Sequence, residues 1–440
     1  MKQTEIGLIP DDWEVKTLNG IGRFIGGGTP NTNNANYWKG NIPWISSSDI
    51  SKDSINTLIP TRFITKEAVS CSATKLCPKN TILIVSRVGV GKLAISNTEV
   101  CTSQDFTNLV CDDNVDESFV AYQLLPKLQH KASEAQGTSI KGITTEEVRA
   151  LQIPFPSYEE QQRIAKSLSD VDALISTTEK LIQKKKNIKQ GTMQNLLTGK
   201  KRLPGFAKTT NYKQSELGLI PVDWEVKSLG EIFEFRPNNT FTRDCLNDSK
   251  GKYQNVHYGD VLIKYPSILD CSKETIPFIN EGINVKFSKY GIVEGDIIIA
   301  DTAEDETVGK VVEVFNLGEK KIVSGLHTFL CRKVTDDFAP KWLGYFMNQA
   351  IFHNQLLPFI TGTKVSAISR TAIQNVKVLI PSKAEQTAIA NVLSSMDKEI
   401  ETLNTKLEKY RNLKTAMMQQ LLTGKIRLIG ERDENKRSIV

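Results

Sequence analysis

The chain has 440 residues, which is enough for two to four domains of ordinary size. Hydrophobic residues make up 39% and charged residues 24%, and this balance excludes an intrinsically disordered chain. The 56 Lys and Arg residues exceed the 50 Asp and Glu residues by a net charge of +6, which permits an anionic partner such as nucleic acid without requiring one.

The distribution of apolar residues and cysteines indicates the compartment. The N-terminal segment has no apolar run as long as that of a signal peptide, and no stretch approaches the roughly 18 apolar residues of a membrane span. Seven scattered cysteines without a CxxC pair fit reduced thiols, and with only four histidines they argue against structural zinc. We therefore expect a cytoplasmic protein without a bound metal.

The beginning of the chain recurs later. Residues Ile6 to Leu18 read IGLIPDDWEVKTL, and residues Leu217 to Leu229, which lie 211 positions further on, read LGLIPVDWEVKSL. Two later matches, both 225 positions apart, join Gly137-Thr138 to Gly362-Thr363 and Leu196–Lys200 to Leu421–Lys425. The second copy is thus 14 residues longer than the first. Between the matching ends, residues 24–136 and 235–360 share little beyond α/β character, so one duplicated frame carries two inserts suited to two different targets.

The repeated start also imitates a nuclease motif. Glu14 and Lys16 follow Asp11 and Asp12, and the second copy repeats the pattern with Asp223, Glu225 and Lys227. The carboxylates are too close in sequence for a site that draws one acid from a neighbouring strand, so we predict a strand edge at each start. No nucleophile elbow, paired Cys and His or methyltransferase tetrad is present, and we predict neither catalytic residues nor metal ligands in this chain.

The first insert contains a turn rich in Gly and Asn, residues 26–32, followed by a segment with two tryptophans, hydroxyls and a lysine, residues 36–49. Such a segment can supply donors to phosphates and base edges, or it can be an ordinary surface loop. Residues Ile82 to Val85 predict a strand that leads into Gly89-Val90-Gly91-Lys92. This run lacks the spacing of a nucleotide P-loop, and no Ser or Thr follows Lys92, so we exclude ATP binding there.

A long helix is predicted from Glu159 to Thr198, which would span about 60 Å at ~1.5 Å per residue. Ser157 opens it, and Gly199 ends it in the left-handed conformation that stops helices. Apolar positions alternate by four and three, as in a coiled-coil seam: Ile164, Leu168, Val171, Ile175, Thr178 and Ile182. The lysines that enter the end of this seam fit a solvated face or phosphate contacts: Lys184, Lys185, Lys186 and Lys189.

The second insert leads from a predicted strand, residues 297–300, into an acidic loop with Thr302 and Thr307. Asp301, Glu304 and Asp305 do not follow the calcium-loop pattern, so we predict a solvated or backbone-capping loop.

A second long helix is predicted after Pro381-Ser382, and it ends at Gly424. Its seam is broken only by Lys414 and otherwise consists of Ile389, Leu393, Met396, Ile400, Leu403, Leu407, Tyr410, Met417 and Leu421. One small domain cannot bury so long a stripe. Two equivalent units related by a near-twofold axis would pack these helices antiparallel.

Together, these motifs resemble the specificity subunits of type I restriction-modification enzymes over nearly the whole chain. The resemblance is carried by the paired Gly-Leu-Ile-Pro-x-Asp-Trp-Glu-Val starts, Gly27–Pro30 through Tyr37-Trp38 to Ile42-Pro43-Trp44, both Gly-Thr pairs, Pro156–Ala165 with Glu160-Gln161 and again Glu385-Gln386, and both Leu-Leu-Thr-Gly-Lys ends. Asp301–Asp305, Gly309-Lys310 and Ser324–Thr328 also resemble one subtype of target-recognition domain.

The resemblance implies an α/β fold in which two globular target-recognition domains are joined by two long antiparallel coiled-coil helices in a pseudo-twofold internal repeat. The implied parts are a first domain (1–155), a central helix (156–200), a linker (201–212), a second domain (213–380), a C-terminal helix (381–424) and a tail (425–440). Each domain would read one half of a bipartite site in double-stranded DNA, and the helices would set the gap.

The resemblance also implies partners. Two methyltransferase subunits would methylate adenines with S-adenosylmethionine, and restriction subunits would use ATP for translocation. Neither cofactor would bind this chain, which would be a recognition subunit and no enzyme itself.

We predict DNA contacts from polar, basic and aromatic residues of the inserts and of the two Gly-Thr turns. In the first half they are Thr29, Trp38, Lys39, Trp44, Ser46, Ser48, Arg87, Lys92, Thr138 and Lys141. In the second half they are Tyr253, His257, Tyr258, Lys264, Lys310, His327, Thr363 and Lys364.

Two rival hypotheses remain open from the sequence. A coiled-coil scaffold whose inserts bind protein would bind DNA weakly and without salt dependence, whereas a phosphate-contacting reader weakens steeply as salt rises. A stand-alone nuclease would need a metal-dependent cut that Glu14→Ala removes. For the DNA reader, deletion of the heptad Leu168–Leu174 should change the accepted gap or abolish specific binding.

Overall fold

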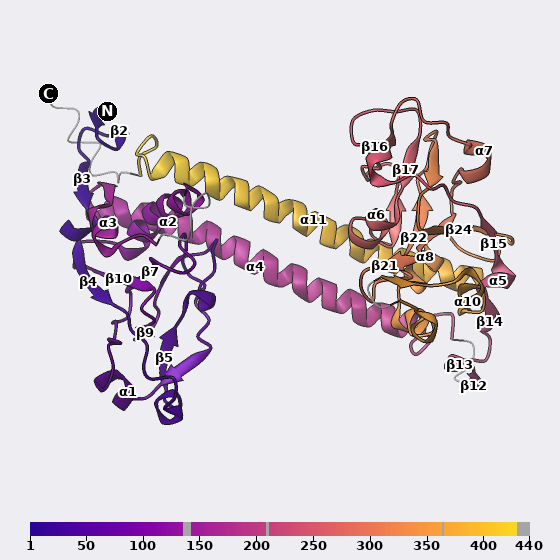
Figure 1. Ribbon diagram of the computed structural model, residues 1–440, viewed down its shortest axis with the longest axis horizontal. Coiled ribbons are helices and arrows are strands. Elements are labelled where there is room, and N and C mark those ends of the chain that lie inside the picture. Colours follow the sequence, from indigo (N-terminus) through magenta and orange to yellow (C-terminus); the bar gives the residue numbers. More distant parts are fainter. Residues whose placement is uncertain (135–141, 208–210, 363–364, 429–440) are drawn as a thin grey trace. The chain divides into compact units, whose positions relative to one another are not determined.

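The structure, a computed structural model, describes residues 1–134, 142–207, 211–362 and 365–428 (Figure 1). The chain divides into two compact units, Met1–Lys180 with Asn404–Val440, and Leu181–Leu403. Each unit therefore contains one globular α/β domain and a part of each long helix. The predicted contacts Thr138, Lys141, Thr363 and Lys364 lie outside the described residues.

The first domain is built around an antiparallel sheet of order β4-β10-β7-β8. All four residues of β7 are buried, as the continuous apolar run Ile-Leu-Ile-Val predicts for a strand covered on both faces. The strands of this sheet are β4 (Gly22–Gly26), β7 (Ile82–Val85), β8 (Leu93–Ile95) and β10 (Phe106–Cys111). A second sheet of order β6-β5-β9 carries the tryptophan segment and consists of β5 (Ile42–Ile45), β6 (Arg62–Ile64) and β9 (Cys101–Thr102).

The remaining elements of the first unit close the domain against the helices. A hairpin of β1 (Lys2–Thr4) and β2 (Gly7–Ile9) precedes β3 (Glu14–Thr17), which pairs with β11 (Gln152–Phe155). The helices of the domain are α1 (Lys66–Ser70), α2 (Glu117–Glu134) and α3 (Thr145–Ala150). Trp13 and the first turns of α4 share one core with α2, which is why the repeated start is needed for packing.

The second domain repeats this plan with additions. Its main sheet, in the order β15-β24-β20-β22-β18, consists of β15 (Phe233–Arg236), β18 (Ile268–Asp270), β20 (Ile297–Ala300), β22 (Val311–Phe315) and β24 (Thr328–Lys333). A second sheet, in the order β16-β19-β17-β23, consists of β16 (Leu246–Asn247), β17 (Gln254–Val256), β19 (Phe278–Ile279) and β23 (Ile322–Ser324). Three strand pairs complete it: β12 (Tyr212–Ser215) with β13 (Gly218–Pro221), β14 (Glu225–Ser228) with β26 (Lys377–Ile380), and β21 (Thr302–Ala303) with β25 (Ser366–Ala367). Its short helices are α5 (Leu229–Ile232), α6 (Tyr258–Ile263), α7 (Phe287–Tyr290), α8 (Trp342–Phe346), α9 (Ala350–His353) and α10 (Arg370–Gln374).

The nuclease-like motifs lie on strands, as predicted. Glu14 and Lys16 are in β3, where Glu14 pairs with Phe155, and the ammonium of Lys16 lies 3.4 Å from Glu14 Oε2. In the second domain Glu225 pairs with Ile380 in the same way. Among the described residues, no group of three or more His, Cys, Asp and Glu side chains is arranged to hold a metal ion.

The two long helices are α4 (Tyr158–Leu196) and α11 (Lys383–Leu421), each of 39 residues, which confirms the predicted helices within about two positions. Gly199 and Gly424 follow them with φ of 71° and 68°, the predicted left-handed stop. A Cβ on Gly199 would lie 2.6 Å from Cδ of Pro221, and one on Gly424 would lie 2.4 Å from Cγ of Pro10. Glycine is therefore required both by the backbone and by the repeated start, which packs on the helix end.

Two lysines that interrupt the apolar seam each pair with an aspartate of the facing helix. In the first unit Lys414 Nζ lies 2.7 Å from Asp172 Oδ1 of the facing helix, and Tyr122 donates to the same carboxylate at 2.7 Å. In the second unit Lys189 pairs with Asp397, to which Tyr345 donates at 2.7 Å.

Lys414 and Lys189 are 225 positions apart, and so are Asp172 and Asp397. Lys414 does interrupt the apolar seam, as the heptad pattern predicted. Its pairing with Asp172 nevertheless joins the two helices, and Tyr122 of the first domain binds the same carboxylate. Lys185 likewise pairs with Glu399 at 2.6 Å, whereas Lys184 and Lys186 are exposed.

Candidate nucleic-acid interface

The tryptophan segment of the first domain forms a compact aromatic group. The rings of Trp38 and Trp44 meet edge to face at 5.1 Å, and the guanidinium of Arg62 lies 4.3 Å from the centre of the Trp44 ring. Trp44 is buried and its indole N–H donates to the carbonyl of Gly28 at 2.9 Å. Because of this burial, Trp44 shapes the Gly-rich turn and offers no surface to DNA. Trp38 is half-buried and Lys39 is exposed, so both can reach a ligand.

A second group in the first domain gathers hydroxyls around Asp49. Ser46 Oγ donates to Asp49 Oδ2 at 2.7 Å, and it also lies 2.8 Å from Ser48 Oγ. Thr61 donates to the other oxygen of Asp49, also at 2.7 Å. Thr29 donates to the exposed side chain of Gln104. Ser48 and Arg87 are exposed, so both side chains are available to a ligand.

Lys92 and Lys310 were both predicted to contact DNA, and the structure places them at equivalent positions inside their domains. Lys92 Nζ donates to the carbonyl of Ser47 at 3.0 Å, and Lys310 Nζ donates to the carbonyl of Leu262 at 2.8 Å. Burial lowers the pKa of Lys310. Each ammonium group thus holds a neighbouring segment against its domain by donating to a main-chain carbonyl.

In the second domain three predicted residues form one aromatic cluster. The His257 and Tyr258 rings lie 4.6 Å apart, and Tyr258 meets His327 edge to face at 5.3 Å. Like Lys310, the predicted residues Tyr253 and Lys264 lie outside this cluster. Tyr253 stacks on Phe287 at 5.7 Å, and Lys264 donates to the carbonyl of Thr275.

His257 is buried and caps helix α6, so its ring is structural. Its Nδ1 accepts from the N–H of Gly259 at 3.3 Å, which requires an unprotonated nitrogen. Burial, followed by the positive charge of Arg243, lowers the pKa of His257, while Asp260 raises it and His327 lowers it further.

This cap leads to a prediction about pH. Because the folded-state pKa lies below the unfolded value of about 6.5, the contribution of His257 to stability is present above that pH and is lost as pH falls below it. We expect the free energy of unfolding of His257→Asn, which keeps a good N-cap, to fall less than that of the wild type as pH drops, because asparagine has no proton to take up. Urea unfolding of the full chain at pH 7.5 and pH 5.5 measures this. The exposed His130→Asn is the control, and an equal pH dependence of wild type and His257→Asn would contradict the prediction.

The two inserts share a hydrogen-bonding frame that sequence comparison missed. Four main-chain hydrogen bonds of the first domain have equivalents in the second. The pairs, written from N–H to carbonyl, are Gly28 to Thr102 (2.8 Å) and Asn239 to Ser324 (2.9 Å), Ser103 to Ile45 (2.9 Å) and Gly325 to Val256 (2.9 Å), Ser86 to Asp105 (2.8 Å) and Asp301 to His327 (3.1 Å), and Ile143 to Ser86 (2.7 Å) and Ile368 to Asp301 (2.9 Å).

The separation of equivalent residues increases along this frame. It is 211 between Ile45 and Val256, 218 between Lys92 and Lys310, and 225 between Ile143 and Ile368. The 14 extra residues of the second copy therefore lie in several loops, and this spreading hides the relation from a single alignment offset. The side chains that the frame carries differ, for example Ser46 and His257, or Asp105 and His327.

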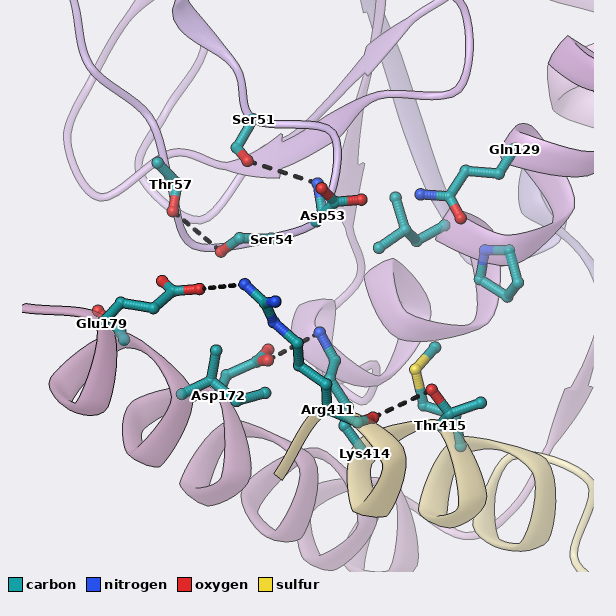
Figure 2. Close-up of a pocket in the computed structure, with 15 residues that line it drawn as sticks. Ser51, Asp53, Ser54, Thr57, Gln129, Asp172, Glu179, Arg411, Lys414 and Thr415 are labelled. Atoms are coloured by element: carbon teal, nitrogen blue, oxygen red, sulfur yellow. Dashed lines mark hydrogen bonds and ion pairs between the residues drawn. The ribbon is translucent and has the colours of Figure 1, made fainter. Parts of the chain in front are cut away.

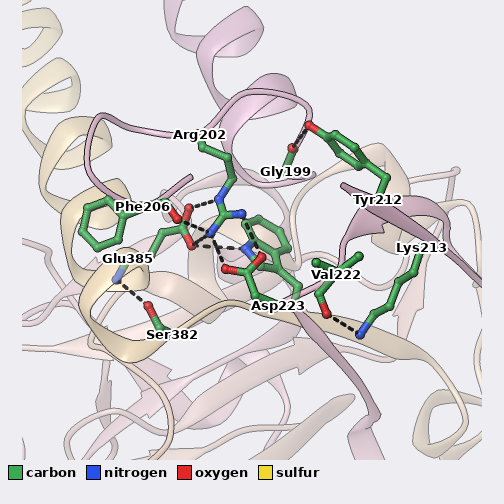
Figure 3. A network of polar contacts seen from close by, with 10 residues as sticks. Gly199, Arg202, Phe206, Tyr212, Lys213, Val222, Asp223, Ser382 and Glu385 are labelled. Carbon is green, nitrogen blue, oxygen red and sulfur yellow. Dashed lines mark hydrogen bonds and ion pairs between the residues drawn. The ribbon is translucent and has the colours of Figure 1, made fainter. Parts of the chain in front are cut away.

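Sequence reasoning also missed a network that joins each helix end to a repeated start. In the second unit Arg202 binds Glu385 and Asp223, and the indole N–H of Trp224 donates to Glu385 at 3.1 Å (Figure 3). Burial disfavours the charge of Arg202, but hydrogen bonds to Glu385 and Asp223 raise its pKa.

The first unit repeats this network with Arg427, Glu160, Asp12 and Trp13. The sequence does contain a signal of this network. Arg-Leu recurs at 202–203 and 427–428, and each arginine lies two positions after a Leu-Leu-Thr-Gly-Lys end.

A cavity of about 700 Å³ lies in the first unit where the loop of Ser51 and Thr57 faces the helix pair (Figure 2). Its cations are Lys414, paired with Asp172, and Arg411, which lies 2.8 Å from Glu179. Since both cations are already paired with carboxylates, neither is available to bind a phosphate in this cavity.

Comparisons with known proteins agree with this duplicated plan. The model of the type I restriction modification DNA specificity domain matches the chain twice, at residues 10–190 and 221–409. The chain is 28% identical over 436 residues to the type I restriction enzyme MjaVIII specificity subunit of Methanocaldococcus jannaschii, which covers 96% of this chain and 94% of that protein. It is 32% identical over 171 residues to the EcoR124I/EcoR124II specificity subunit of Escherichia coli, 37% of this chain and 42% of that protein.

A solved structure supports the fold. The type I restriction-modification S subunit from M. genitalium matches with a TM-score of 0.54 at 16% identity, covering 96% of this chain and 98% of that chain. In the part of the chain that the structure describes, no helix has the length and apolar character needed to cross a membrane. The duplicated domains, the helix-end networks and the two matches to the family model together show that the chain belongs to the family of type I restriction-modification DNA specificity subunits.

Proposed function

We propose that this chain recognises a bipartite sequence in double-stranded DNA, with one half read by each domain. The observation that carries the proposal is the shared frame, which holds equivalent loops in the same way but equips them with different side chains. A frame of this kind presents two different reading surfaces on one scaffold. Exposed Lys39 and Arg87 supply positive charge to the face of the first domain, as phosphate contacts require.

The helices α4 and α11 would form an antiparallel coiled coil that sets the gap between the two halves. Each is continuous for 39 residues, which corresponds to about 58 Å at ~1.5 Å per residue. Two half-sites on a duplex that turns every ~34–36 Å must be met at the correct distance and rotation. A stiff helix pair satisfies both conditions, whereas a flexible linker satisfies neither.

The chain itself would be a non-catalytic recognition subunit in the cytoplasm. Two methyltransferase subunits would dock on the two equivalent halves of the frame, and restriction subunits would join them. S-adenosylmethionine and ATP would bind those partners. The duplication supports this stoichiometry, because two equivalent surfaces accept two copies of one partner.

A genome-wide map of methylated adenines in the host, with and without this gene, tests the proposal. We expect one split motif to disappear when the gene is deleted. Exchange of residues 1–155 for the same region of another specificity subunit ends just before α4 and should alter one half of the motif only. A motif that survives deletion would contradict the proposal, and so would DNA binding by the full chain that does not weaken as salt rises, the result expected of a protein-binding scaffold.

A further inference from the structure

The turn between β23 and β24 holds His327 on a rigid support. The N–H of Gly325 donates to the carbonyl of Val256 at 2.9 Å, and the N–H of Asp301 donates to the carbonyl of His327 at 3.1 Å. The N–H of Tyr258 reaches the carbonyl of Leu326 at 3.4 Å. Two segments of the domain, one at Val256–Tyr258 and one at Asp301, thus fix one three-residue turn.

The backbone of His327 is in the left-handed region, with φ of 55°. Glycine adopts this conformation freely, whereas a residue with a side chain is strained there, so its presence points to a need for the imidazole. Asp105, the equivalent residue in the first domain, is not among the non-glycine residues with positive φ in the described chain. The left-handed backbone is therefore particular to the second domain and is not a feature of the shared frame.

The ring of His327 is oriented from two sides while its side chain remains 46% exposed. Its Nδ1 lies 3.3 Å from Asp301 Oδ1 and 3.3 Å from Thr302 Oγ1, and Thr302 donates to Asp301 at 2.7 Å. The ring of Tyr258 packs against it edge to face at 5.3 Å. A carboxylate only accepts, so Nδ1 is the donor toward Asp301, and in this tautomer Nε2 is the acceptor that the ring presents.

We propose that His327 is a specificity-determining residue, and that its Nε2 accepts a hydrogen bond from an exocyclic amino group, adenine N6 or cytosine N4, in the major groove. This inference rests on the proposed function and names the chemistry of one reading position. The equivalent Asp105 of the first domain is also an acceptor and is half-buried, with Ser103 Oγ donating to it at 3.3 Å. Both domains thus place an acceptor at the same point of the frame.

The test compares methylation motifs in hosts that carry the gene deletion, the wild-type chain, His327→Asn or His327→Gln. Asparagine tolerates the left-handed backbone, so it removes the ring without adding strain. We expect one position of the second-domain half to lose discrimination by roughly ten- to hundredfold, while the first half and the gap stay the same. The second-domain half is the one that exchange of residues 1–155 leaves unchanged.

The control is His130→Asn, because His130 is 74% exposed on α2 of the other unit, and it should leave the motif intact. An unchanged motif in both His327 variants would overturn the proposal. A changed gap or first half would also overturn it, as would a clear loss of thermal stability in His327→Asn, since the residue would then be structural. If gene deletion removes no motif, the proposed function fails and this inference fails with it.

Discussion

Removing seven residues from each long helix, Ser176–Ile182 and Glu401–Leu407, should shorten the accepted gap by about three base pairs or abolish specific binding. Seven residues correspond to about 10.5 Å of helix, which equals about three base pairs at ~3.4 Å each. Because seven residues are nearly two whole helical turns, the deletion hardly rotates one end of the helix relative to the other. Three base pairs, in contrast, rotate the duplex by roughly 100°. A site with a shorter gap is therefore accepted only if the domains can follow this rotation.

The structure changes where such a deletion belongs. Within Leu168–Leu174, the heptad chosen from the sequence, Leu168 is fully buried in the core of the first domain and Asp172 holds both Tyr122 and Lys414. Its removal would damage the domain as well as the spacer. The segments at 176–182 and 401–407 are equivalent in the repeat. Their buried hydrophobic residues Ile182 and Leu407 belong to the seam and to neither domain core, and the two ion pairs that are lost, Glu179–Arg411 and Lys273–Glu401, are exposed and contribute little.

The measurement is the methylation motif of the host, or selection of bound sequences from a random DNA library by the full chain. Replacing exposed Ser176, Thr177 and Lys180 by alanine keeps the length and should keep the gap. If the doubly shortened chain kept the original gap, the helices would not set it.

Replacing Glu385 by alanine should destabilise the second unit by about 3–5 kcal/mol. Glu385 is fully buried, and it accepts hydrogen bonds from Trp224 and from Arg202, whose side chain is only 7% exposed. Its removal leaves a guanidinium and an indole N–H without their shared acceptor, although Asp223 remains at 2.9 Å from Arg202. The network ties α11, the end of α4 and the repeated start together, so all three should loosen together.

The repeat provides the matched variant for this test. Glu160→Ala removes the equivalent carboxylate from the first unit, where Arg427 and Trp13 depend on it. Hydrogen exchange of the full chain should show faster exchange in residues 181–403 for Glu385→Ala and in residues 1–134 for Glu160→Ala. The adjacent Glu159 is exposed, and Glu159→Ala should change neither region. Equal effects of Glu159→Ala and Glu160→Ala would show that the network contributes nothing to stability.

The sequence alone determined the duplicated frame, the two long helices and their glycine stops. These features depend on local patterns, because heptad spacing, helix openings and left-handed glycines follow from a few neighbouring residues. The strand edges at Glu14 and Glu225 were also predictable, since alternating residues in a short repeated segment favour a strand.

Only the tertiary structure decided which candidate residues face outward. Trp44, Lys92 and Lys310 have the composition of a DNA-binding surface, yet each donates to a main-chain carbonyl that is distant in sequence. His257 is buried, and its ring caps α6. Long-range packing also turned Lys414, an interruption of the heptad pattern, into the partner of Asp172. Burial and pairing depend on which segments meet in space, and single-sequence periodicity carries no information about those meetings.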